Sequence, residues 1–91
     1  MNILIADDEK PAREELSFLL QDLLPEASLT TAKNGDDALS LLRESDFDVV
    51  FLDIEMPGKD GLQVATKILE RPSPPRIVFA TAYSEHAVEA F

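Results

Sequence analysis

The side chains in this sequence with the clearest capacity for chemistry are carboxylates that directly follow short apolar runs. Asp7 and Asp8 follow Ile3–Ala6, and Asp53 follows Val49–Leu52. Carboxylates held about 5 Å apart repel by roughly 3 kcal/mol per pair at an effective dielectric of about 20, so a cluster of them favours a bound cation. All-oxygen ligands with access to water suit Mg²⁺. The acids therefore predict a magnesium site, provided that the fold brings them together.

Four apolar segments are predicted to be β-strands. Short length and β-branched residues favour strands buried on both faces for three of them, whereas the segment 28–32 alternates and is typical of a strand near an edge. In chain order the predicted strands are Ile3–Ala6, Ser28–Ala32, Val49–Leu52 and Ile77–Ala80. Thr81 follows the last strand, so a hydroxyl joins the carboxylates as a polar group at a strand end.

The first predicted helix begins near Pro11, which suits a first turn, and ends before Pro25. Leucines at i, i+3, i+4, i+7 and i+8 predict one apolar stripe on it, made of Leu16, Leu19, Leu20, Leu23 and Leu24.

Two further helices are indicated by turn signals. Asn34-Gly35 precedes the second, with Asp36 as its predicted cap. Asp60-Gly61 precedes the third. The residues predicted to face inward are Ala38, Leu39, Leu41 and Leu42 on the second helix, and Leu62, Ala65, Ile68 and Leu69 on the third. A fourth helix would begin after Ser84.

Strands alternating with helices imply right-handed crossovers and a mostly parallel sheet with helices on both faces, in a single α/β domain covering residues 1–91. The carboxyl ends of parallel strands share one edge, where open α/β sheets place their ligands. Asp7, Asp8, Asp53 and Thr81 are therefore expected to converge there.

Composition narrows the function classes. The net charge is −10 and there is no cysteine, so binding to nucleic acid or to anionic membranes is disfavoured and no thiolate metal site exists. The single histidine, His86, lies beyond the last strand. No segment fits a signal peptide or a membrane span, which makes a cytoplasmic location the expectation.

Three motifs, in register along the whole chain, resemble response-regulator receiver domains of the CheY-like family. The segments are Asp7-Asp8-Glu9, Val49–Gly61 with Leu52-Asp53-Ile54-Glu55-Met56-Pro57 at its centre, and Ile77–Tyr83. The central segment and Thr81-Ala82-Tyr83 are most similar to receivers joined to LytTR-type DNA-binding domains. The resemblance implies a flavodoxin-like doubly wound sheet in the order 2-1-3-4.

The resemblance also implies roles for individual residues. Asp53 would be the phosphoacceptor for a histidine kinase, and Thr81 the switch hydroxyl that binds the phosphoryl oxygen. Mg²⁺ would be held by the carboxylates of Asp8 and Asp53 and the main-chain carbonyl of Glu55, with Asp7 acting mainly through a metal-bound water. Transfer to a carboxylate is mostly positioning and charge neutralisation, so such a domain is a switch and not an enzyme. Its output would be a DNA-binding, transcription-regulating domain outside this chain.

This sequence departs from the family because no fifth strand and helix follow, and with them the lysine that pairs with the phosphoryl group is missing. A strand, a helix and two connections need on the order of 25 residues, so a C-terminally incomplete receiver is expected, either a truncation of a longer regulator or a natural short protein. The segment Ile77–Ala80 would then be an unprotected sheet edge, and a homodimer is the predicted consequence.

Two rival functions remain open. A haloacid-dehalogenase-type phosphatase also uses an aspartate nucleophile and Mg²⁺, but needs a second aspartate where this chain has Glu55. A dimerisation module impaired in phosphotransfer would keep the fold and use the sheet edge. Neither a G-x-x-x-x-G-K nor a G-x-G-x-x-G segment occurs, which argues against a nucleotide-binding enzyme.

Overall fold

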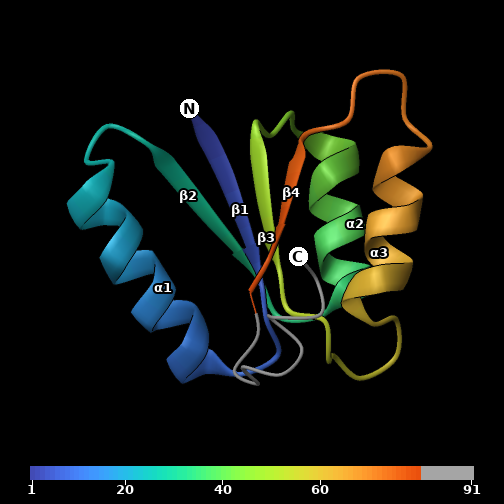
Figure 1. Cartoon of the computed structure of the whole chain (residues 1–91), viewed down its shortest axis with the longest axis horizontal. Coiled ribbons are helices and arrows are strands. Elements are labelled where there is room, and N and C mark those ends of the chain that lie inside the picture. The colour runs from blue at the N-terminus through green and yellow to red at the C-terminus, as the bar shows by residue number, and fades with distance from the viewer. Residues whose placement is uncertain (81–91) are drawn as a thin grey trace.

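A computed structural model describes residues 1–80 as strands and helices in strict alternation. In order they are β1 (Asn2–Ala6), α1 (Lys10–Leu23), β2 (Ser28–Ala32), α2 (Gly35–Glu44), β3 (Val49–Leu52), α3 (Gly61–Leu69) and β4 (Arg76–Phe79). The strands form one parallel sheet in the order β2-β1-β3-β4 (Figure 1). The predicted fold class and strand order are confirmed.

The sheet is covered by α1 on one face and by α2 and α3 on the other (Figure 1). Alternate residues of β1 point to opposite faces of the sheet. Leu4 belongs to the core beneath α2 and α3, whereas Ile3 and Ile5 pack with Leu20 of α1. This period of two is the strand pattern, so both faces of β1 are buried. The prediction of a strand buried on both faces is confirmed for β1.

The apolar stripe predicted for α1 is only partly buried. Leu20 lies in the core and Leu16 packs against it, but Leu19, Leu23 and Leu24 are exposed. The prediction was wrong for these three because α1 is the one described helix on its face, so fewer neighbours surround it. Pro11 does stand in the first turn, as expected.

The cap of α2 also differs from the prediction. The helix begins at Gly35, so the extended residue before it is Asn34, whose Oδ1 accepts a hydrogen bond from the Asp37 N–H at 2.8 Å. Asp36 lies inside the first turn, where its carboxylate pairs with Lys59. Of the four residues predicted to face inward, Ala38, Leu39 and Leu42 are buried and Leu41 is half-buried.

The buried face of α3 lies about one residue off the predicted one. Asp60 and Gln63 form a reciprocal capping box that starts the helix at Gly61. The face turned to the core then falls at i, i+3, i+4 and i+7, on Gly61, Val64, Ala65 and Ile68. The prediction was right for Ala65 and Ile68 and wrong for Leu62 and Leu69, which are 54% and 63% exposed.

β4 is less buried than its apolar sequence predicted. Ile77 and Phe79 pack against the core beneath α2 and α3, but Val78 on the other face is 38% exposed. Helix α1 lies over the β2 side of the sheet and leaves Val78 of β4 partly uncovered (Figure 1). The helix predicted after Ser84 lies outside the described residues. In the part of the chain that the structure describes, every helix is too short or too polar to span a lipid bilayer.

The position of the α3 face can be tested with a matched pair of truncations. Ile68→Ala removes a fully buried side chain and should lower the free energy of unfolding by about 2–5 kcal/mol. Leu69→Ala, next to it and exposed, should change it by no more than about 0.5 kcal/mol. Urea denaturation measures both. Equal losses would show that the helix is rotated relative to the structure.

Candidate functional site

The acidic residues are positioned by the pairing of the two central strands. The Asp53 N–H donates to the carbonyl of Ala6 at 3.0 Å, which extends the β1–β3 ladder to the residue after β3. On the other side of β1, the Asp7 N–H donates to the carbonyl of Ala32 at 3.1 Å. Both aspartates are therefore held by main-chain hydrogen bonds at the same edge of the sheet.

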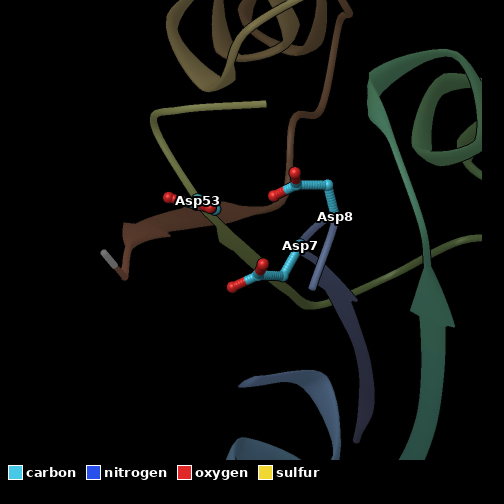
Figure 2. Close-up of side chains that lie close together, drawn as sticks. All are labelled: Asp7, Asp8 and Asp53. Atoms are coloured by element: carbon cyan, nitrogen blue, oxygen red, sulfur yellow. The ribbon is translucent and has the colours of Figure 1, made fainter. Parts of the chain in front are cut away.

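Three carboxylates meet at this edge, as the sequence predicted. One oxygen from each of Asp7, Asp8 and Asp53 lies within 4.8 Å of the others (Figure 2). Asp8 is exposed, and Asp7 and Asp53 are half-buried. Three acids at this spacing, with water access, match the oxygen ligands that a hard divalent cation prefers.

The cluster opens into a hollow of about 440 Å³ between the sheet edge and α1. Its acidic lining extends beyond the cluster to Glu9, Glu15 and Glu55. The opposite wall is apolar and comes from α1: Ala12, Leu16 and Leu19. A small anion that enters it needs compensating positive charge, because at least six carboxylates surround the space.

Electrostatics single out Asp53 within the cluster. Its pKa is raised from 3.8 to about 6, first by burial and next by repulsion from Asp7, with smaller contributions from Asp8 and Glu55. A hydrogen bond from the Glu55 N–H to Asp53 Oδ1, 3.2 Å long, opposes the rise. Asp53 is thus mostly ionised at neutral pH, and its negative charge destabilises the folded state.

Two features that hold the site were not predicted. The Arg13 guanidinium donates to the main-chain carbonyl of Asp7 at 2.8 Å, and the Glu9 N–H donates to Asp7 Oδ1 at 2.9 Å. Together they fix the loop that carries Asp7 and Asp8. An arginine one turn into a helix behind an acidic loop was the available signal for this contact.

Gly61 is the second unpredicted feature. A Cβ at this position would collide with the main-chain oxygen of Asp53 and the Cα of Ile54. The start of α3 therefore rests directly on the backbone of the candidate nucleophile, and the Gly61 N–H donates to the carbonyl of Ile54 at 2.8 Å. The Asp60-Gly61 pair, read only as a turn from sequence, has this packing role.

Thr81 is the hydroxyl predicted to join the carboxylates at the site. Thr81 lies outside the described residues, although the chain reaches the site edge at Ala80, whose N–H donates to Leu52. Lys10 is the first residue of α1, where it pairs with Glu14, and Lys59 pairs with Asp36.

Comparison with known families identifies this arrangement. The model of the response regulator receiver domain matches residues 3–91. The chain belongs to the response regulator receiver domain family. The predicted family is confirmed.

Similar proteins point to the same group. The receiver is 50% identical to the positive alginate biosynthesis regulatory protein of Pseudomonas aeruginosa and 37% identical to the sensory transduction protein LytT of Bacillus subtilis. Each match covers the whole chain but only 37% and 38% of the relative, so the receiver spans little more than a third of their length. The predicted likeness to LytTR-type regulators is confirmed.

Solved structures of response regulators have a similar fold. The response regulator TrrA of Thermotoga maritima, in complex with Mg²⁺–BeF, is 40% identical with a TM-score of 0.85, covering 97% of this chain and 75% of TrrA. TrrA in complex with the histidine kinase ThkA matches at 41% identity and a TM-score of 0.80, over 90% of this chain and 69% of TrrA.

The raised pKa of Asp53 gives a stability prediction. Because the folded-state pKa lies above the ordinary value, the folded state binds this proton more tightly than the unfolded chain does. The contribution of protonated Asp53 to the free energy of unfolding is therefore lost as the pH rises from about 4 through about 6. Asp53→Asn should raise the free energy of unfolding near pH 7 by on the order of 1 kcal/mol after allowance for solvent screening, with a corresponding rise in melting temperature, and the gain should vanish towards pH 4.

Thermal unfolding in EDTA across this pH range measures the effect. Asp22→Asn is the matched control, because it removes one negative charge from an exposed position on α1. A pH-independent gain, or the same gain in the control, would contradict the assignment to Asp53.

Proposed function

We propose that this receiver is a phosphoacceptor switch in which Asp53 takes a phosphoryl group from a histidine kinase. The observation that carries the proposal is the convergence of the Asp7, Asp8 and Asp53 carboxylates within 4.8 Å at the open end of two adjacent strands. Family membership and the complex of TrrA with ThkA support the choice of partner.

The same residues fit Mg²⁺. Asp7, Asp8 and Asp53 offer carboxylate oxygens, and we propose the main-chain carbonyl of Glu55 as the further ligand. The fit rests on the donor set, which is all oxygen and partly open to water. A divalent cation there would neutralise the charge that accumulates on phosphoryl oxygens during transfer. The Mg²⁺–BeF complex of TrrA supports this proposal.

The transfer itself needs an ionised, accessible nucleophile. A carboxylate oxygen of Asp53 forms a bond to phosphorus while the phosphorus–nitrogen bond of the kinase phosphohistidine breaks. The imidazole nitrogen keeps the bonding pair, and the product is an acyl phosphate on Asp53. With a pKa of about 6, Asp53 has lost its proton at neutral pH, and its half-buried position on the hollow admits a donor. Thr81 is proposed to bind the phosphoryl oxygen.

We further propose that this switch controls a C-terminal DNA-binding output domain, as its regulatory relatives suggest. The chain would then act on transcription without touching DNA itself. The proposed cycle is one transfer followed by slow hydrolysis, which separates it from the phosphatase alternative. Glu55, in place of a second aspartate, argues for the switch.

Phosphorylation from a small acyl phosphate tests the proposal. After incubation with acetyl phosphate and Mg²⁺, intact mass spectrometry should show the addition of one phosphoryl group. EDTA and Asp53→Asn should each abolish it, and Asp8→Asn should reduce its rate, whereas Asp22→Asn should leave it unchanged. Absence of any adduct would overturn the switch in this chain and favour the impaired dimerisation module. Continuous turnover of a phosphate ester would favour the phosphatase.

Self-association of the 91-residue chain through β4 is also proposed. In the described sheet β4 pairs only with β3, and its residues alternate between exposed and half-buried, with no charge between Ile77 and Phe79. Unpaired apolar strand edges invite a second chain. A two-fold pair that covers this edge would be the simplest closed form.

Light scattering at micromolar concentration checks this pairing. The unsubstituted chain should give the mass of a dimer, and Val78→Lys should shift it to a monomer. Leu69→Lys adds the same charge to an exposed leucine of α3 and should leave the dimer intact. A well-folded monomer before any substitution would show that the edge does not pair.

A further inference from the structure

A cationic groove lies between α2 and α3 and follows their length, from Asp36 and Lys59 near the starts of the two helices to Arg43, Lys67 and Arg71 near their ends. Its lining residues are Asp36, Leu39, Arg43, Lys59, Lys67 and Arg71. The whole chain has only eight lysines and arginines against 18 acids, and four of the eight line this one groove. The two helices lie side by side on the same face of the sheet (Figure 1), so the groove follows their seam.

Within residues 1–80, three of the four cations have no carboxylate partner. In residues 1–80 the ion pairs are Lys10 with Glu14 and Lys59 with Asp36. Arg43, Lys67 and Arg71 therefore stand without an ion pair in the described structure. Arg71 donates to the carbonyl of Leu42 at 2.7 Å, which anchors one guanidinium at the end of α2.

The helix dipoles explain only part of this charge. Arg43 and Lys67 stand in the last turns of α2 and α3, where a cation is favoured by the carbonyl ends. One cation near the carbonyl end of each helix is enough to interact with its dipole, and Arg71, just beyond the end of α3, is a third. The charge is also turned towards a shared groove instead of being spread around the two helices.

We propose that this groove binds a carboxylate-rich segment of a partner protein. A single small phosphate is a poorer fit, because the four cations do not surround one point but are spread along the seam, from Lys59 before the start of α3 to Arg71 beyond its end. Exposed arginine and lysine side chains reach outward from different helices, which suits several carboxylates along a peptide. Elsewhere the strongly acidic surface would repel such a segment.

The test is the binding of a labelled hexaglutamate peptide at low salt, followed by fluorescence anisotropy. Hexaglutamate should bind, hexaglutamine should not, and affinity should fall steeply as salt is added. Arg43→Gln with Lys67→Gln should weaken binding by roughly fivefold, the effect of losing two exposed ion pairs. Arg71 is left in place because it holds the end of α2.

Lys10→Gln with Lys33→Gln is the charge-matched control, and both double variants are checked for folding by circular dichroism. The control and Asp53→Asn should bind as the unsubstituted chain does. No binding at low salt, equal loss in the two double variants, or equal binding of hexaglutamine would overturn the proposal. So would competition by inorganic phosphate as strong as that of unlabelled hexaglutamate.

Discussion

The parallel register of β1 and β3 is the constraint on which the rest of this molecule depends. Ala6 stands opposite Leu52, so the loops that leave the two strands begin side by side, and the hydrogen bond from Asp53 to Ala6 locks that level. A slip of one strand by one residue would turn its core-facing side chain, Leu4 or Val50, out of the core and would shift Asp53 along the sheet edge relative to Asp7 and Asp8. The core beneath α2 and α3 therefore fixes the site as well as the fold.

This arrangement places stability and function in opposition. Burial and neighbouring carboxylates raise the pKa of Asp53, and the same carboxylates form the acidic cluster proposed to hold a cation. The backbone around Asp53 is nevertheless tightly fixed, by the strand ladder on one side and by the close approach of Gly61 on the other. A rigid main chain beneath a repulsive side-chain cluster is suited to a switch whose charge changes.

Charge is unevenly distributed over the fold. Acids gather at the carboxyl ends of the strands, while half of all the lysines and arginines line the seam of α2 and α3. Because each helix runs antiparallel to the strands, the helix ends that favour cations lie at the edge opposite the carboxylates. Three of the four groove cations, Arg43, Lys67 and Arg71, stand near those ends, whereas Lys59 lies at the other end of the seam, where it pairs with Asp36.

The pattern of the sequence determined the α/β class and the grouping of Asp7, Asp8 and Asp53, because strand ends in a parallel sheet necessarily share an edge. The strand order followed from the resemblance of its motifs to receiver domains. Local patterns could not determine which leucines are buried. Leu19, Leu62 and Leu69 satisfy helical periodicity, yet they are exposed, since burial depends on how many neighbours the opposing layer supplies. The contacts of Gly61 with Asp53 and of Arg13 with Asp7, and the gathering of cations in one groove, were likewise decided by tertiary packing between segments distant in the chain.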